Sequence, residues 1–425
     1  MNNHKLTLQE AIFMNLNIMM GAGIIVNSVF LTKTTQLFGA FTYLMVGFFM
    51  LPLINSIAQL IKLFPSGGFY AYIRPISPFL AFVTCWSYFF GKLASASLII
   101  FVSATFIKQL FPVALASVTT LSLTLIILTI FVYLNLFNLK TGGRLQQLFF
   151  LAKSLPILLV VVFGILTFQS ASIELTEFDF LKLAGTLPFV LYSCSGFEAA
   201  CAMSRNIQDP EKNAPKAIFY SFFFIIMIYA LFQFFVAFLL LPNITNVHDY
   251  KDAFPHMVSL MPISLALKTK LASFINFIIG FSTLGGAYGI IFSNSWNLYT
   301  LAENRHTFYP NLILYKNRHH IPVFAVIIQG IICALFIMIS KGTAIVLQQT
   351  ASLGTIIAYM MSSIVLIRYQ QGFWLLSYLS LVTCCGLIFS WIVSTINYGI
   401  ISLLLFVFMT VFGLIMYKTT KNQSR

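Results

Sequence analysis

The stretch NLNIMMGAGIIVNSVFL, residues 15–31, decides how the rest of this sequence folds. It lies in an uncharged run, 11–32, that is long enough to cross a bilayer, because a transmembrane helix needs about 20 apolar residues. Yet Gly21 and Gly23 fall near its middle, where each glycine weakens a helix by about 1 kcal/mol relative to alanine. We therefore expect a broken helix at the bilayer midplane.

The composition indicates a polytopic membrane protein. The chain has 425 residues, of which 59% are hydrophobic and 8% charged, and its mean hydropathy is +0.93. No ordinary soluble domain of this size has such a balance. We expect an all-α fold with twelve transmembrane helices, at about 11–32, 36–61, 79–107, 115–139, 146–170, 183–204, 217–242, 271–302, 321–340, 343–367, 374–395 and 397–417.

The net charge of +14 indicates membrane topology rather than a nucleic-acid partner. With the N-terminus in the cytoplasm, most of the 24 lysines and arginines fall in cytoplasmic loops, as the positive-inside rule requires. We expect both termini to be cytoplasmic and the protein to span a plasma membrane, such as a bacterial inner membrane. The first helix has no cleavage site after it and is expected to be a retained span.

A second predicted span is interrupted in the same way. The segment LPFVLYSCSGFEAACAMS, 187–204, carries Ser-Cys-Ser-Gly at 193–196, followed by Glu198. Two breaks five helices apart are typical of transporters built from inverted repeats. Small residues for close helix packing are the alternative, but the two glycines of a GxG motif lie about 200° apart around a helix. We expect five-helix repeats at 1–170 and 171–368 and two further helices at 369–425.

Broken helices expose main-chain groups that suit a zwitterion. A half-helix that starts after Gly21 presents free N–H groups and the positive end of its dipole, which favours a carboxylate. The half-helix before it ends in free carbonyls at about Ile18, Met19 and Met20, which favour an ammonium group. Residues 193–197 can repeat the arrangement. Unwound backbone in a membrane is tolerated where it lines a cavity or meets a ligand.

Three ionisable residues lie within predicted spans, where a functional role is the default interpretation. Lys153 either snorkels to the interface, exchanges a proton during transport, or provides a fixed charge in place of a sodium ion. Lys92 either pairs with Glu198 or projects into the cavity. Glu198 either gates, takes up protons, or holds the unwound segment through hydrogen bonds.

The sequence contains no enzyme or metal-binding motif. GxSxG, HExxH and Walker-type phosphate loops do not occur, and all six histidines fall in predicted loops or the N-terminal tail. We therefore expect no catalytic residue, no metal site and no cofactor.

Five motifs in order resemble the amino acid–polyamine–organocation superfamily of permeases, which share the LeuT fold. They are Gly-Ala-Gly-Ile at 21–24, PSGGFYAYI at 65–73, Lys153 with Pro156, GFEAACAMSRNIQDPEKNAPKAI at 196–218, and SWNLYTLAENRHTFYP at 295–310. The resemblance implies alternating-access transport of an amino acid or related amine, by proton symport or by exchange.

The resemblance also implies where the substrate binds. The N–H groups of Ala22, Gly23 and Ile24 would take the α-carboxylate, carbonyls near Ile18 and Met19 and at 193–195 would take the α-ammonium, and Phe197 would form an aromatic lid. Lys153 resembles the lysine that occupies the sodium-site region in proton-coupled or sodium-independent members. The implied substrate-binding set is Ile18, Met19, Gly21, Ala22, Gly23, Ile24, Ser193, Cys194, Ser195, Gly196 and Phe197, with Lys153 and Glu198 for proton coupling and Lys92 at the cavity.

The sequence departs from the family pattern at the inner gate. Arg205 and Asn206 replace residues that are usually acidic, Trp296 stands in place of an arginine, and Glu303-Asn304 replaces Arg-Asp. Two other functions stay open: a polyamine or cationic amine carrier, which the scarcity of acidic residues in the spans disfavours, and a non-transporting sensor of the same fold. A metal-ion carrier would need an acidic or Asn-rich first break and a Met or His in the second, and neither is present.

Overall fold

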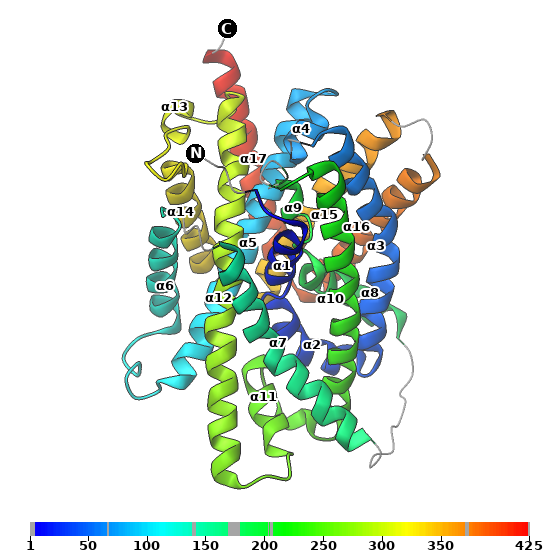
Figure 1. Ribbon diagram of the computed structural model, residues 1–425, viewed down its shortest axis with the longest axis vertical. Helices are drawn as coiled ribbons and strands as arrows, with labels where there is room; N and C mark the ends of the chain where they lie inside the picture. Colours follow the sequence, from blue (N-terminus) through cyan, green and yellow to red (C-terminus); the bar gives the residue numbers. More distant parts are fainter. Residues whose placement is uncertain are drawn as a thin grey trace.

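The protein is an elongated bundle of helices (Figure 1), seen in a computed structural model that describes residues 5–65, 68–137, 142–168, 179–202, 204, 207–369 and 374–423. The helices in the described residues are α1 (Leu8–Met19), α2 (Gly23–Thr35), α3 (Phe38–Leu63), α4 (Phe69–Ile73), α5 (Pro78–Leu110), α6 (Thr120–Leu134), α7 (Gly142–Thr167), α8 (Phe180–Cys194), α9 (Ala199–Ala202), α10 (Pro210–Leu240), the 3-10 helix η3 (Leu241–Asn246), α11 (Tyr250–Ser259), α12 (Leu265–Glu303), α13 (Pro310–Ile313), α14 (Val323–Ser340), α15 (Ala344–Tyr369), α16 (Trp374–Tyr398) and α17 (Ile401–Gln423).

The number of membrane spans differs from the twelve predicted. Within the described residues, nine helices are long and apolar enough to cross a membrane, and the bent pair α1 and α2 makes a tenth. The other two predicted spans correspond to α6 and α8, which have 15 residues each and are short for a bilayer that needs about 20. α8 is short because the chain unwinds at Ser195, and α9 adds only four residues beyond the break.

One of the two predicted repeat boundaries falls outside the described residues, and the other falls at the end of α15. The first, at 170/171, lies within 169–178, and the second, at 368/369, directly precedes 370–373. The chain reverses between α16 and α17 at Gly399, which has a φ of +112°. The predicted spans 374–395 and 397–417 place the boundary between the last two helices at 396, three residues before Gly399.

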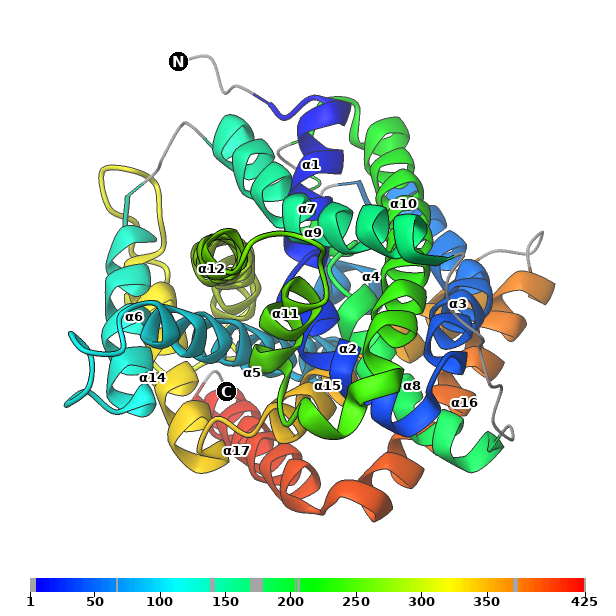
Figure 2. The same cartoon turned by 90° about the horizontal axis from the view of Figure 1, so that it is seen from below.

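The broken first helix lies in the interior of the bundle. Viewed end-on, α1 and α2 pass near its centre, with α10 on one side and α12 on the other (Figure 2). α5 is the most enclosed candidate span, with 89% of its most apolar window buried, whereas the corresponding value for α17 is 28%. The apolar side chains on α17 and the other outer helices therefore form the lipid-facing surface.

One end of the bundle is joined by contacts between segments far apart in sequence. The side chain of Thr7 and that of Glu10 form a capping box that starts α1, and Leu6 pairs with Ile207 after the second break. At the same end, the Tyr70 hydroxyl of α4 lies 2.8 Å from Nε2 of His306, just beyond α12. Burial raises the pKa of Tyr70 to about 12, so its hydroxyl keeps its proton.

His306 makes the stability of this end depend on pH. Burial, and to a smaller extent the charge of Arg74, lowers the pKa of His306 to about 4, below the ordinary value of about 6.5. Between these two values the unfolded chain binds a proton that the folded chain does not, so stability falls as the pH drops from about 6.5 toward 4. We expect His306→Gln to reduce this loss, measured as the difference in unfolding temperature between pH 7.5 and pH 5 in detergent.

The exposed His320→Gln variant is the matched control and is expected to behave as the wild type. An acid-induced loss in His306→Gln as large as in the wild type would contradict this role of His306.

Candidate functional site

The first helix break frees main-chain donors, as predicted. α1 and α2 meet at an angle of 46° across Met20, Gly21 and Ala22. The Gly21 N–H donates to the Met19 carbonyl at 2.7 Å, a tight local turn rather than a helical bond. Within the described part of the chain, the N–H groups of Ala22 and Gly23 donate no hydrogen bond, because the first residues of a helix have no preceding carbonyl.

The carbonyls at the end of α1 are not equivalent. The Met19 carbonyl accepts from the Gly21 N–H and from the Tyr229 hydroxyl, at 2.7 and 3.0 Å, which uses both of its lone pairs. For the Ile18 carbonyl, by contrast, no hydrogen bond is found among the described residues. Of these two carbonyls, that of Ile18 is therefore the one that can accept a hydrogen bond from a ligand in this conformation.

The second break lies against the first. α8 ends at Cys194, and Gly196 follows with a φ of +128°. A Cβ on Gly196 would lie 3.0 Å from the Ile18 side chain and 3.1 Å from the Met19 backbone nitrogen. Glycine is required there both by the backbone conformation and by this close approach.

α2 and α8 approach each other just as closely. A Cβ on Gly23 would lie 2.8 Å from Oγ and 2.9 Å from Cα of Ser193. Next to this contact, the Asn27 side-chain amide donates to the Phe189 carbonyl at 2.7 Å and to the Ser193 hydroxyl at 2.8 Å. The two broken helices are therefore joined by packing and by buried hydrogen bonds.

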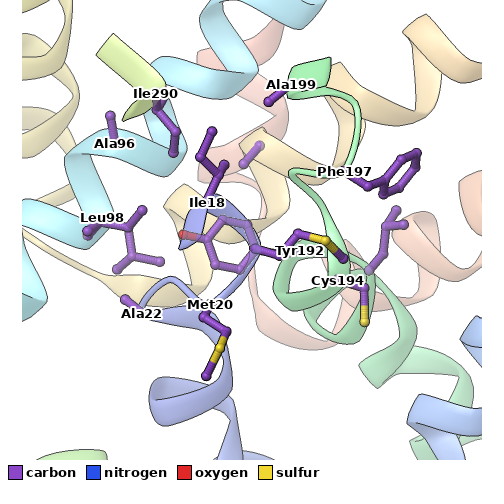
Figure 3. Close-up of a cluster of buried hydrophobic side chains, with 14 of the residues drawn as sticks. Ile18, Met20, Ala22, Ala96, Leu98, Tyr192, Cys194, Phe197, Ala199 and Ile290 are labelled. Carbon is purple, nitrogen blue, oxygen red and sulfur yellow. The ribbon is translucent and has the colours of Figure 1, made fainter. Parts of the chain in front are cut away.

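A narrow cavity lies where the breaks meet, and the side chains of Ile18, Tyr192 and Ile290 come together there (Figure 3). In this conformation it has room for about one water molecule, so the lining must move apart before a solute as large as an amino acid can bind. Seven of the predicted residues line it: Ile18, Met19, Gly21, Gly23, Lys92, Ser193 and Ser195.

Four residues that line the cavity were not predicted: Ser95, Ile99, Tyr192 and Ile290. The sequence carries a signal for two of them, because Ser95 and Ile99 follow Lys92 by three and seven positions, and these spacings place side chains on one face of a helix. Tyr192 directly precedes the second break. Ile290 has no such signal.

Phe197 does not line the cavity in this conformation. Its side chain is fully buried and stacks on Tyr359, with ring centroids 5.7 Å apart, and it meets the ring of Phe222 edge-on. The positive φ of Gly196 turns the chain so that Phe197 faces these aromatic rings. Ala22, Ile24, Cys194 and Gly196 are likewise not among the residues that line the cavity in this conformation.

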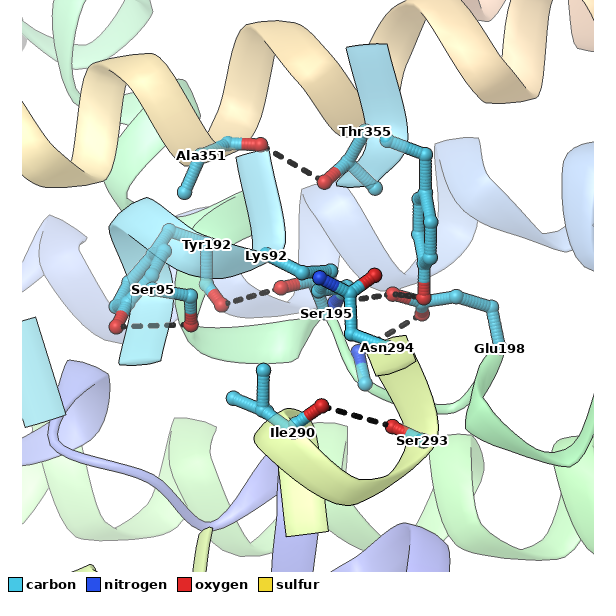
Figure 4. Close-up of polar contacts among 12 residues, drawn as sticks. Lys92, Ser95, Tyr192, Ser195, Glu198, Ile290, Ser293, Asn294, Ala351 and Thr355 are labelled. Atoms are coloured by element: carbon cyan, nitrogen blue, oxygen red, sulfur yellow. Dashed lines mark hydrogen bonds and ion pairs between the residues drawn. The ribbon is translucent and has the colours of Figure 1, made fainter. Parts of the chain in front are cut away.

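Glu198 is the hub of a buried polar network (Figure 4). Its carboxylate forms an ion pair with Lys92 and accepts from the hydroxyls of Tyr88, at 3.3 Å, and Tyr359, at 2.9 Å. It also accepts from the Gly196 N–H at 2.8 Å. The network ties the unwound segment to α5 and α15. Tyr88 and Tyr359 were not predicted, because nothing in the sequence relates two tyrosines so far apart to one carboxylate.

Lys153 does not snorkel to the interface. Its Nζ donates to the backbone carbonyl and the side-chain oxygen of Asn17, at 2.8 and 2.6 Å, and the residue is only 6% exposed. It therefore places its ammonium at the negative end of the α1 dipole, next to the first break. Lys153 also lines a second narrow cavity, together with Gly21, Ile24 and Thr283.

The structure describes only some of the inner-gate residues at which the sequence departs from the family pattern. Arg205 and Asn206 lie outside the described residues. Lys316 places its Nζ 5.1 Å from the ring centroid of Trp296 and 4.3 Å from that of Tyr299. Glu303 is exposed and forms no ion pair within the described ranges.

With this geometry in view, comparison with known proteins defines the class of membrane protein. The model of the amino acid permease family matches residues 10–421, so the chain belongs to that family. The family consists of permeases rather than enzymes, in agreement with the sequence prediction.

Individual relatives are distant. The chain is 25% identical to the amino-acid permease AapA of Bacillus subtilis, over 68% of this chain and 64% of that protein. It is 19% identical to the aromatic amino acid transport protein AroP of Salmonella typhimurium, over 76% and 70% of the two chains. It thus spans just under two thirds of the length of AapA.

Among solved structures, the chain is similar to a manganese transporter of Eremococcus coleocola, with a TM-score of 0.63 and 12% identity. The match covers 97% of this chain and 93% of that structure. The similarity shows the LeuT-like fold that the sequence predicts. Within the described residues no group of three or more His, Cys, Asp or Glu side chains could hold a metal ion.

The Glu198 network predicts a large stability effect. We expect Glu198→Ala to lower the free energy of unfolding by about 3–5 kcal/mol, because it leaves the buried Lys92 ammonium without its partner. Glu198→Gln keeps a side-chain oxygen that can accept hydrogen bonds, so we expect it to lower the free energy of unfolding by less. The measurement is thermal or denaturant unfolding in detergent, with the exposed Glu303→Ala as the control. Equal stability of Glu198→Ala and Glu303→Ala would contradict the role of Glu198 as a structural hub.

Proposed function

We propose that the protein is a secondary transporter that moves an amino acid across the membrane by alternating access. The observation that supports this most directly is the meeting of the two helix breaks at one buried cavity. Unpaired backbone groups inside a membrane are stable only where they line a cavity or bind a ligand. The names of AapA and AroP, an amino-acid permease and an aromatic amino acid transport protein, agree with an amino acid substrate.

The main chain at the breaks would hold the zwitterion. The free N–H groups of Ala22, Gly23 and Ile24 at the positive end of α2 would bind the α-carboxylate. The Ile18 carbonyl, with main-chain oxygens at 193–195, would bind the α-ammonium. Met19 would contribute its side chain to the wall rather than its carbonyl, since Tyr229 and Gly21 already occupy that oxygen.

We also propose that the chain crosses the membrane twelve times, with α6 and the α8–α9 segment as short spans and both termini cytoplasmic. The 5+5 repeat arrangement at 1–170 and 171–368 would follow, with 369–425 as two added helices. Both termini lie toward the same end of the bundle, in agreement with an even number of crossings (Figure 1).

Lys153 would couple substrate transport to the state of the first break. Its ammonium is bound to Asn17, in the last turns of α1, and it lies beside Gly21. Movement of α1 during alternating access would break these contacts, so a proton gained or lost at Lys153 would bias the movement. Proton symport and exchange are both compatible with this arrangement.

Uptake of radiolabelled amino acids into proteoliposomes tests the function. We expect uptake of at least one common amino acid, driven by a pH gradient or by internal exchange substrate. If no amino acid moves under either condition and none shifts the unfolding temperature, the transporter proposal is wrong.

Gly23→Ala tests the contact between the breaks. We expect uptake to fall by at least about tenfold, because the new Cβ would lie within 3 Å of Ser193 and would push α2 away from α8. Gly386→Ala in α16 is the matched control, since a Cβ there meets nothing within 4 Å. Wild-type uptake by Gly23→Ala would exclude a substrate site that depends on this close approach.

Lys153→Ala tests the coupling role. We expect transport to slow greatly and the remaining transport to lose its dependence on pH, because α1 loses its buried counter-charge. Initial uptake rates between pH 5.5 and 8 measure both effects, with the exposed Lys62→Ala as the control. An unchanged rate and pH profile in Lys153→Ala would rule out a coupling function.

A further inference from the structure

Among the described residues, the side chains that line the cavity include a positive charge but no negative charge. Binding of the α-carboxylate and α-ammonium by the main chain does not explain this difference. The polar side chains that line it are those of Lys92, Ser95, Tyr192, Ser193 and Ser195. The Ser193 and Ser195 hydroxyls already donate to the carbonyls of Phe189 and Tyr192, and Lys92 is the cation among the five side chains. No carboxylate belongs to the lining formed by the described residues.

The nearest acidic residue has no capacity left for a ligand. The carboxylate of Glu198 is fully buried and already meets Lys92, Tyr88, Tyr359 and the Gly196 N–H. An ionised carboxylate has about four acceptor positions, and these four donors fill them. A positively charged substrate group would therefore have to displace one of them, and it would meet the Lys92 ammonium as it did so.

Lys92, in contrast, has N–H donors that are not used by a hydrogen bond within the described residues. An ammonium group has three N–H donors, and the part of the chain that the structure describes supplies one hydrogen-bond acceptor, Glu198. The Tyr88 ring lies 5.3 Å from Nζ and adds a cation–π contact. The ion pair holds the ammonium at the cavity wall, where it can bind an acceptor group without losing its partner.

The other walls combine apolar surface with a hydroxyl donor. Ile99 and Ile290 provide apolar surface, and the Tyr192 hydroxyl accepts from Ser95 at 3.3 Å, which leaves its own proton available for donation. This inference rests on the function proposed above, in which the breaks hold the α-carboxylate and α-ammonium. We propose that the site selects amino acids whose side chain ends in an oxygen acceptor, a carboxylate or a carboxamide, and that Lys92 is the residue that selects them.

The first test compares the uptake of four radiolabelled amino acids by the full-length protein in proteoliposomes: glutamine, glutamate, leucine and lysine. We expect uptake of glutamine or glutamate to exceed that of leucine and lysine by at least about tenfold, as for one charge-assisted hydrogen bond. Transport of lysine or leucine in preference to both acceptor-bearing substrates would overturn the selectivity and leave transport itself standing. Failure to move any amino acid would count against the transport function.

A double variant, Lys92→Gln with Glu198→Gln, tests the residue assignment. It removes both charges of the pair, so neither partner is left as an unpaired buried charge. We expect the ratio of glutamine or glutamate uptake to leucine uptake, measured within the variant, to fall by about tenfold from the wild-type ratio. Lys182→Gln, which removes an exposed lysine that pairs with Asp179, is the matched control.

Two further variants keep the proposal testable if the double variant does not fold. Lys92→Arg retains the cation and is expected to retain the preference, whereas Tyr192→Phe loses one hydroxyl and is expected to lower the glutamine-to-leucine ratio several-fold. A wild-type ratio in the double variant would overturn the assignment, and if that variant does not fold, a wild-type ratio in Tyr192→Phe would overturn it.

Discussion

The structure depends on one constraint, which is that backbone groups inside a membrane cannot remain without hydrogen-bond partners unless they line a cavity or bind a ligand. The chain unwinds at two places inside the bundle, after Met19 and after Cys194, and satisfies this constraint by bringing the two places into contact. Gly23 and Gly196 permit the contact because neither has a side chain. The unpaired groups therefore face one shared cavity instead of lipid.

Buried charged side chains stabilise both helix breaks. Lys153 neutralises the carbonyl end of α1 through Asn17, and Glu198 holds the second break against α5 and α15 through Lys92 and two tyrosines. Each charge would be costly in a membrane by itself, and each is bound by groups of opposite polarity. The ionisable residues of the spans thus fix the positions of the two breaks. Movement of either break has to rearrange a buried network, as a transporter that alternates between two conformations requires.

Local signals predicted the parts of the site that depend on backbone chemistry. Gly21 and Gly23 marked the first break, the Ser-Cys-Ser-Gly segment marked the second, and the structure shows both within a residue or two of the expected place. The pairing of Lys92 with Glu198 was one of two alternatives, and the structure supports both of them, since Lys92 pairs with Glu198 and also lines the cavity. Snorkelling of Lys153 was a wrong alternative, because Asn17 offers two acceptors nearer than the interface.

Long-range packing accounts for what the sequence did not predict. Phe197 was expected at the site, but the conformation of Gly196 directs it toward Tyr359 and Phe222. Tyr88, Tyr359 and Ile290 come from α5, α15 and α12, and only the assembled bundle brings them near the breaks. The short length of α8 likewise depends on where the chain unwinds, which a hydropathy profile does not show.

The central claim is that the main chain at the two breaks binds both charged ends of an amino acid. Competition with modified substrates tests it most directly, using the best-transported amino acid, its carboxamide, its decarboxylated amine and its N-acetyl derivative against uptake of the labelled parent. The account predicts that all three modified compounds compete at least about a hundredfold more weakly than the parent, because each removes a charge that the breaks bind. Equal competition by the decarboxylated amine or by the N-acetyl derivative would contradict it.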